Sequence, residues 1–149
     1  MATSNAEYVA ECLISLSHTK QNPVSNLKLQ KLLYYAQAWH LALFKEPLFE
    51  EEIEAWVHGP VVPQIFRGYR DCKWNPITNG GAIPNPSFAG HLEEVWRVYG
   101  NLSAFDLERL AHSEDPWRIA RGGLPPDSSS SAIIEKSSMQ EYYSLRLNG

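Results

Sequence analysis

The sequence predicts a mainly α-helical protein of one domain, and three observations lead to this fold class. Residues 27–44, the predicted central helix, are apolar on nearly every side of a helical projection, so they should form the buried centre of a helical fold. Shorter segments with helical spacing and capping residues lie before and after them. The 149 residues are about one domain long, and such a domain buries roughly 70% of its unfolded surface. We therefore expect residues 1–149 to form a single compact multi-helix domain.

The predicted central helix has one face that should point into the core. Side chains that recur at three- and four-residue steps define this face: Leu29, Leu32, Leu33, Ala36, Trp39, His40 and Leu43. The other side is also largely apolar, so neighbours should cover the helix on more than one side. Ser25 follows Pro23 and is placed to cap the helix start by accepting a hydrogen bond from a free backbone N–H.

Residues 48–58 predict a short β-hairpin or an extended arm. Apolar side chains alternate with the others as in a half-buried strand, with Ile53, Ala55 and Val57 against Glu52, Glu54 and Trp56. Gly59 and Pro60 should end the extended run, because glycine tolerates positive φ and proline has no N–H for a ladder. A brief helix with Pro63 in its first turn should follow.

Shorter elements should surround this centre. Ser4 and Glu7 have the spacing of a capping box and predict a helix at the start of the chain. Residues 71–86 are rich in proline, glycine and asparagine and predict the main surface loop. An amphipathic helix over 88–99 should end with Gly100 as a left-handed cap.

Two short helices should come next. Ser103 and Asp106 are placed to cap the first of them. Asp115, Pro116 and Trp117 predict the N-cap, the first helical proline and a buried aromatic residue of the second.

The last part of the chain combines a linker-like composition with a final helix. Residues 124–137 are rich in proline and serine and predict a flexible connector, within which Ile133 and Ile134 could dock as a short extended piece. Ser138 and Glu141 form another capping-box pattern and predict a short C-terminal helix.

Charge and composition favour a protein partner. The net charge of −4 and the pI near 5.7 lack the basic excess that phosphate binding requires, so no direct nucleic-acid binding is expected. Cys12 and Cys72 have no metal or redox spacing and should be reduced thiols. The sequence starts without a secretory pattern, and its longest apolar tract is too short to cross a bilayer, which predicts a cytoplasmic protein with no membrane contact.

No catalytic, cofactor-binding or metal-ligating pattern stands out. No two of the five histidines are four residues apart, and neither a Gly-x-Ser-x-Gly motif nor a phosphate loop is present. His112 with Glu114 and Asp115 is the best local acid–base cluster, but helix capping and the helix dipole explain it equally well. We therefore expect no enzyme activity.

Two features invite a partner-binding interpretation. Five carboxylates lie within nine residues, and they form either an ordinary solvated face or a docking patch for a basic partner: Glu46, Glu50, Glu51, Glu52 and Glu54. Trp56 lies on the glutamate side of the strand pattern, where it either faces a partner or covers the central helix.

Three motifs resemble the Panacea-domain family, which is also called the SocA-like antitoxin family. The first is LKLQKLLYYAQAWH at 27–40, and the second is AWVHGPVVP at 55–63. The third combines Leu102-Ser103 with Asp115-Pro116-Trp117. The motifs fall in the family's order and spacing, and the resemblance runs from about Asn5 to Arg121.

The resemblance implies a mostly helical fold and an antitoxin that binds and neutralises a toxin encoded beside it. Partners in the family are varied, and many of them inhibit translation. One branch delivers its toxin to a protease, and members also occur in prophages. The predicted function is direct binding of a cognate protein toxin. A proteolytic adaptor that contacts a cellular protease and an enzyme with an unrecognised site are the alternatives.

The residues predicted to bind the partner come from these motifs and from the glutamates: Lys28, Lys31, Tyr35, Glu50, Glu51, Glu52, Glu54, Trp56, His58, Gly59 and Pro60.

Overall fold

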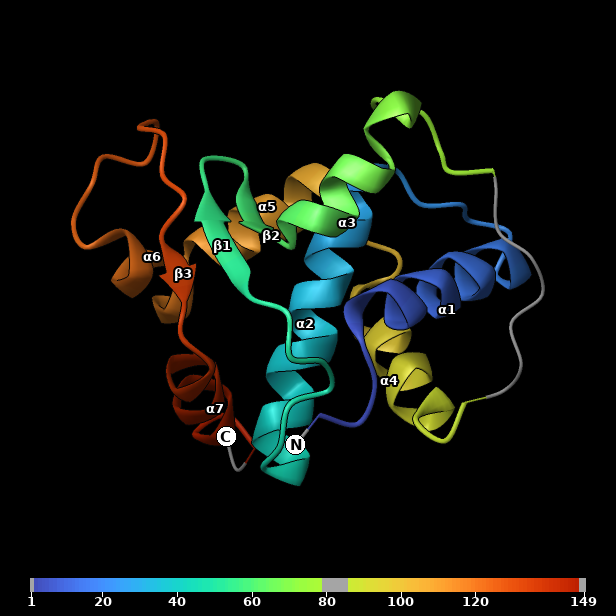
Figure 1. Cartoon of the computed structure of the whole chain (residues 1–149), viewed down its shortest axis with the longest axis horizontal. Helices are drawn as coiled ribbons and strands as arrows, with labels where there is room; N and C mark the ends of the chain where they lie inside the picture. Colours follow the sequence, from blue (N-terminus) through green and yellow to red (C-terminus); the bar gives the residue numbers. More distant parts are fainter. Residues whose placement is uncertain (1, 79–85, 148–149) are drawn as a thin grey trace.

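The computed structural model describes residues 2–78 and 86–147, and it confirms a mainly α-helical fold with a short hairpin (Figure 1). The elements described are, in chain order, α1 (Ala6–Thr19), α2 (Asn26–Phe44), β1 (Ile53–Trp56), β2 (Gly59–Val61), α3 (Pro63–Gly68), η1 (Arg70–Cys72), α4 (Ala89–Tyr99), α5 (Ala104–His112), α6 (Asp115–Arg121), β3 (Ile133–Ile134) and α7 (Lys136–Ser144). None of the described helices combines the length and hydropathy that a bilayer span requires.

Helix α2 is the predicted central helix, and it stands in the middle of the molecule (Figure 1). The hydroxyl of Ser25 accepts from the backbone N–H of Lys28 at 3.3 Å, so the predicted cap is confirmed. Helices α1, α3, α4, α5 and α7 and strand β2 all contact α2. The core-face prediction is wrong for Leu43, which is 49% exposed because it lies next to the end of α2, beyond the part of the helix that is buried in the core.

Two buried glutamines of α2 bind the chain that follows it. The side-chain oxygen of Gln37 accepts from the N–H of Leu48 at 2.7 Å, and its nitrogen donates to the carbonyl of Phe49 at 2.7 Å. The side-chain oxygen of Gln30 accepts from the N–H of Val62 at 2.9 Å. Polar residues are therefore tolerated in this interior because each satisfies backbone groups that would otherwise be buried without a partner.

The three-stranded antiparallel sheet has the order β2-β1-β3. Trp56 pairs with Gly59, so Val57 and His58 form the hairpin turn. The expectation that Gly59 and Pro60 end the extended run is therefore wrong, since both residues belong to β2. Pro60 is accepted because β2 is an edge strand, where a missing N–H costs no ladder bond.

Several predicted helix starts move by one to three residues. Asn5 and not Ser4 caps α1, because its side-chain oxygen accepts from the N–H of Tyr8 at 2.8 Å. Glu114 occupies the N-cap position of α6, which places Asp115 inside the first turn. Glu135 occupies that of α7, so Ser138 lies within the helix. The predicted cap of α5 is confirmed, because Ser103 accepts from the N–H of Asp106 at 3.0 Å.

Gly100 is needed for a different reason from the one predicted. Its φ is −62°, so it is not the left-handed cap of α4. A Cβ at this position would overlap the ring and carbonyl of Trp96. The glycine therefore permits a close approach of backbone to the tryptophan.

The predicted main surface loop at 71–86 lies partly outside the described residues, which omit 79–85. Its first part includes the end of η1 and the exposed Trp74, followed by the fully buried Ile77. The N–H of Ile77 donates to the carbonyl of Val24 at 2.8 Å, which fixes this stretch beside the entrance to α2.

The segment after α6 returns to the sheet and then to α2. Arg121 donates to the carbonyls of Pro125 at 2.8 Å and Ser128 at 2.6 Å. Ile133–Ile134 forms strand β3 against β1, so the expected docking is confirmed. The flexibility of 124–137 remains a prediction.

Helix α7 packs on α2 through a cluster of tyrosines around one carboxylate. The hydroxyls of Tyr35 and Tyr143 donate to Oε1 of Glu114 at 2.6 and 2.9 Å. Since Tyr143 uses its proton there, the hydroxyl of Tyr34 donates to the oxygen of Tyr143 at 3.0 Å. Tyr99 stacks on Tyr35 with ring centroids 4.0 Å apart. Hydrogen bonds thus join α2, α7 and the N-cap residue of α6 in one partly buried polar network, and Tyr99 of α4 packs against it.

Stability should depend on pH through this network. Burial raises the pKa of the Glu114 carboxyl above its ordinary value, although the two tyrosine hydroxyls lower it. The folded chain then holds a proton on Glu114 at pH values at which the unfolded chain has released it. The stabilisation that this protonated carboxyl gives is fully present below the unfolded pKa, and it is lost as pH rises through the folded pKa. We expect Glu114→Gln to remove that loss, so that the variant gains stability relative to the wild type across this window.

Urea unfolding of both proteins between about pH 4 and about pH 8 measures this difference. The difference should level off above the folded pKa of Glu114. Stability curves that stay parallel across the whole range would contradict a raised pKa at this position.

Candidate functional site

The three motifs that carry the family resemblance meet at the β1–β2 hairpin. From α2, the Lys31 ammonium donates to the carbonyl of Pro60 at 3.4 Å. From α6, the indole N–H of Trp117 donates to the carbonyl of Trp56 at 2.9 Å, and Arg121 donates to the carbonyl of Ala55 at 3.3 Å. Donors that lie 29 to 66 positions from their acceptors in the sequence thus hold the hairpin backbone in one place.

The contact between Lys31 and Gly59 explains the glycine in the hairpin. Gly59 has a φ of +105°, which side-chain-bearing residues rarely adopt. A Cβ there would lie 2.8 Å from Cε of Lys31. The lysine side chain therefore fills the space that a larger residue at position 59 would need.

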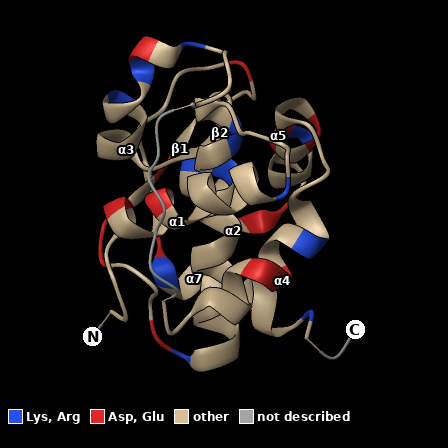
Figure 2. Cartoon of the chain, turned by 90° about the vertical axis from the view of Figure 1, so that its right-hand side faces the viewer, with Lys and Arg blue, Asp and Glu red and all other residues tan. Residues whose placement is uncertain are grey.

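Three cations are buried in the described part of the chain, and none of them is within ion-pair distance of a carboxylate there: Lys28, Lys31 and Arg121. Figure 2 shows basic positions of α2 in the interior beside β2. Lys28 donates to the carbonyl of Gly100 at 2.5 Å. Burial lowers the pKa of the Lys28 ammonium and lowers the pKa of Lys31 to about 8. Backbone carbonyls, rather than acidic side chains, therefore solvate these charges.

The structure separates the predicted partner-binding residues into two groups. Five are buried in this chain and support the hairpin or the core: Lys28, Lys31, Tyr35, Gly59 and Pro60. Six are exposed or half-buried: Glu50, Glu51, Glu52, Glu54, Trp56 and His58. A direct contact with a partner remains a prediction for all of them, and only the second group lies on the surface of the chain.

Trp56 and His58 form the outer side of the hairpin. The half-buried Trp56 packs edge-on against Phe66 of α3 at 5.3 Å between ring centroids, and its N–H donates to Oε1 of Glu54 at 2.8 Å. It therefore contacts α3 while part of its surface stays open to solvent. His58 lies 3.4 Å from a carboxylate oxygen of Glu108 on α5.

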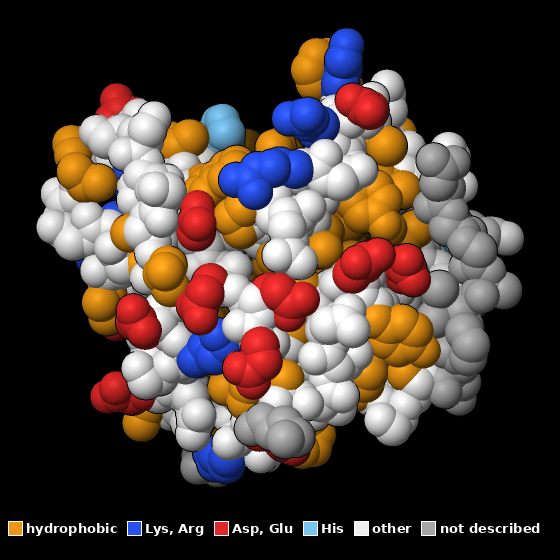
Figure 3. Space-filling model, viewed as in Figure 1, with side chains coloured by type: hydrophobic (Ala, Val, Ile, Leu, Met, Phe, Trp, Pro, Cys, Tyr) orange, Lys and Arg blue, Asp and Glu red, His pale blue; other side chains and the backbone are white. Residues whose placement is uncertain are grey.

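Several acidic side chains gather on the face of the molecule shown in Figure 3, and the predicted glutamate patch runs up to and into β1. Three of its members have partners within the chain. Glu51 accepts from the N–H of Ala6 at 3.1 Å, at the start of α1, where a carboxylate is favoured by the helix dipole. Glu52 pairs with Lys136 at 3.0 Å, and Glu54 accepts from Trp56. Glu46 and Glu50 are exposed. Ordinary structural roles therefore explain part of the acidic run.

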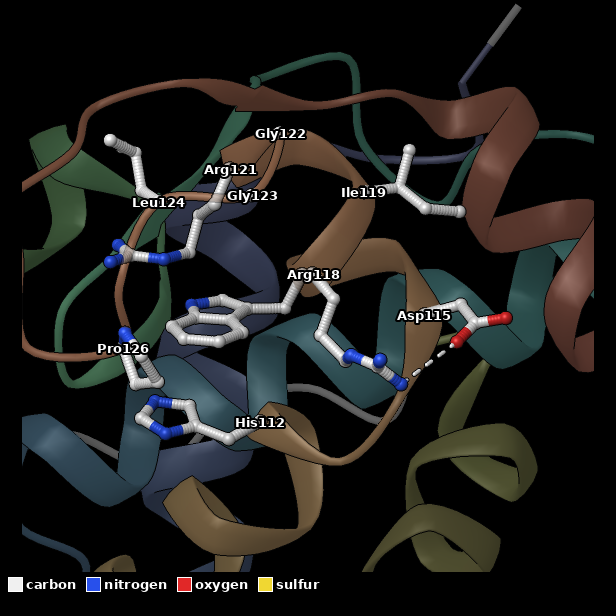
Figure 4. Close-up of a pocket in the computed structure, with 10 residues that line it drawn as sticks. His112, Asp115, Arg118, Ile119, Arg121, Gly122, Gly123, Leu124 and Pro126 are labelled. Carbon is white, nitrogen blue, oxygen red and sulfur yellow. Dashed lines mark hydrogen bonds and ion pairs between the residues drawn. The ribbon is translucent and has the colours of Figure 1, made fainter.

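A pocket of about 500 Å³ is lined by residues of α6 and of the segment after it, and two of these residues, Trp117 and Arg121, also bind the hairpin (Figure 4). The indole of Trp117 lies between the side chains of His112 and Arg121, which also line the pocket. The His112 ring lies 3.9 Å from the indole at an interplanar angle of 15°, and the Arg121 guanidinium lies 4.5 Å from the indole centroid. Burial lowers the pKa of the His112 imidazole, which favours the neutral form of the ring.

This pocket is the part of the site that sequence reasoning missed. His112, Glu114 and Asp115 do not converge as an acid–base cluster, because Glu114 faces the tyrosines and His112 stacks on Trp117. The signal that could have pointed to it was the Asp-Pro-Trp motif followed by two arginines. No group of three or more potential metal ligands occurs among the residues that the structure describes.

Comparisons with known proteins agree with the motif resemblance. The model of the Antitoxin SocA-like, Panacea domain family matches residues 29–86. The protein "Antitoxin SocA" from Caulobacter vibrioides (strain NA1000 / CB15N) is 31% identical over 134 residues. That alignment covers 80% of this chain and 71% of the relative. No solved structure matches the chain.

Proposed function

The chain belongs to the family of SocA-like antitoxins with a Panacea domain, and from this membership we propose that it neutralises a cognate protein toxin by direct, stoichiometric binding. The toxin class that the family resemblance favours is an inhibitor of translation. The antitoxin acts without turnover, by masking a surface that the toxin needs. Inhibition then follows from mass action between two proteins.

Family membership is the single observation that carries this proposal. The geometry adds a candidate surface for the contact. Lys31 and Trp117, which belong to the family motifs, donate hydrogen bonds to the hairpin backbone. These bonds support the backbone on which the partly exposed Trp56 and the exposed His58 lie. A half-exposed tryptophan on a rigid support has the properties of an interface hot spot, because it offers a large contact area at a low cost in conformational entropy.

The glutamates beside the hairpin suit a toxin with a basic surface. Glu50 and Glu52 are exposed and lie on the approach to β1. Acidic groups at the rim of an interface mainly raise the rate of association with a basic partner. The proposed contact therefore combines a central aromatic anchor with an acidic rim.

The test is a titration of toxin activity with the purified antitoxin, with the protein encoded by the neighbouring gene as the toxin. Inhibition should saturate at a fixed molar ratio, without any protease or cofactor. Trp56→Ala should weaken toxin binding more than about tenfold, as expected for a hot-spot residue. Its melting temperature should fall by less than that of a core variant.

Two results would overturn the proposal. Complete inactivation of the toxin by a small catalytic fraction of this protein would show that it is an enzyme. Inhibition that appears only when a cellular protease is added would show that it is an adaptor that delivers the toxin for degradation.

A further inference from the structure

Two residues that line the Trp117 pocket each have a buried nitrogen atom for which the described residues provide no hydrogen-bond partner: Nε of Arg121 and Nε2 of His112. Arg121 is only 4% exposed, and its two terminal nitrogens already donate to three backbone carbonyls. The N–H on its Nε is therefore shielded from solvent and has no hydrogen-bond acceptor among the described residues. A buried donor on a cation that lacks a partner is costly, so it marks a place where a ligand group would be stabilised.

The charge at the pocket favours an anion. Two guanidinium groups, those of Arg118 and Arg121, line it together with one carboxylate, that of Asp115. Arg118 is bonded to Asp115 over 3.5 Å, and both side chains are more than half exposed, so this pair is weak and can be exchanged for another. Figure 4 shows the Arg118 side chain directed toward Asp115. The positive excess at this pocket contrasts with the net charge of −4 of the chain.

The remaining wall is apolar. Trp117, Ile119, Leu124 and Pro126 contribute apolar side chains to its lining. Ile119 and Leu124 are 64% and 47% exposed, which leaves apolar surface available at the rim. A group that fits must therefore combine a carboxylate with an adjoining apolar body.

We propose that this pocket is a second contact point for the toxin and takes a carboxylate of the toxin together with a neighbouring apolar side chain. The inference rests on the proposed function and adds to the hairpin surface a site of opposite charge. Arg118 binds the carboxylate at the rim, and Arg121 supplies the buried N–H. A toxin that binds both the acidic hairpin surface and the Trp117 pocket must carry a basic region beside an acidic, partly apolar one. This requirement makes the antitoxin specific for its cognate toxin.

The first test uses a small probe and does not require the toxin. N-acetyl-phenylalanine presents a carboxylate on an apolar body, and N-acetyl-phenylalaninamide is its neutral counterpart. In ¹⁵N NMR titrations, the acid should shift the side-chain N–H signals of Arg121 and Trp117, and the amide should not. Arg118→Gln should weaken the response to the acid about tenfold. Arg97→Gln is the matched control, because Arg97 is also exposed and paired with a carboxylate three residues away on a helix. It should leave the response unchanged.

The second test uses the toxin. Arg118→Glu should weaken toxin binding about tenfold with an unchanged melting temperature, and Arg97→Glu should not. N-acetyl-phenylalanine should compete with the toxin. Arg121 is left intact, because its loss would also release the segment after α6.

The outcomes separate this proposal from the proposed function. Toxin neutralisation that is unaffected by Arg118→Glu and by the probe would overturn the pocket as a toxin contact while leaving the antitoxin function in place. Probe binding without competition would likewise overturn it and assign the pocket to a free carboxylate. No response to the probe in NMR would refute the ligand class even if no toxin were neutralised.

Discussion

Leu33→Ala should lower the free energy of unfolding by about 2–5 kcal/mol, through the lost transfer energy of the side chain and the cavity that it leaves. Leu33 is fully buried in the middle of α2, where helices pack around the α2 surface. The surrounding structure can therefore collapse only partly into the space. Chemical denaturation with a linear extrapolation to water measures the loss.

Leu43→Ala is the matched control on the same helix. Leu43 is 49% exposed near the end of α2, so its truncation should change stability by less than about 0.5 kcal/mol. Equal losses in the two variants would contradict the central position of Leu33.

Gly59→Ala should also destabilise the protein strongly, with a loss of about 1–3 kcal/mol from the backbone conformation alone. The φ of +105° lies outside the range that alanine adopts without strain. The added Cβ would also lie 2.8 Å from Cε of the buried Lys31. The lysine side chain must then move, which disrupts its hydrogen bond to the carbonyl of Pro60. Both effects act on the hairpin, so toxin binding should weaken together with stability.

Gly90→Ala provides the comparison for this variant. Gly90 lies in the first turn of α4, and a Cβ there would meet nothing within 4 Å. Alanine is a better helix former than glycine, so this variant should be neutral or slightly stabilised when both proteins are unfolded in urea. A Gly59→Ala protein as stable as Gly90→Ala would mean that the hairpin turn relaxes freely and that Lys31 does not fix it.

Local patterns predicted much of the fold because they were strong and had one physical solution. Residues 27–44 are apolar on nearly every side of the helix, and exposing such a surface to water is unfavourable, so the central helix had to be buried on most sides. The alternation at Ile53 to Trp56 similarly required a strand with one buried face. Helix starts were predicted less well where two capping residues stood side by side, as at Ser4 and Asn5, because backbone geometry chooses between them.

The candidate site was only partly predictable. The motifs identified Trp56, the hairpin and Trp117, but not that Lys31, Trp117 and Arg121 all donate to hairpin carbonyls. Glu51 was interpreted as part of an acidic patch, whereas it binds the N–H of Ala6 at the start of a helix 45 positions away. Such contacts leave no periodic trace, because they depend on where distant elements pack.

The sequence by itself thus determined the fold class, the buried central helix, the strand and the family, since each follows from a local pattern or motif. The tertiary structure decided which residues face outward, which cations are buried among carbonyls, and that the Trp117 pocket leaves an N–H of Arg121 unsatisfied by the described residues. The physical reason is that burial and hydrogen-bond partnership are properties of the packed chain, set by residues far apart in the sequence, whereas periodicity is a property of neighbours.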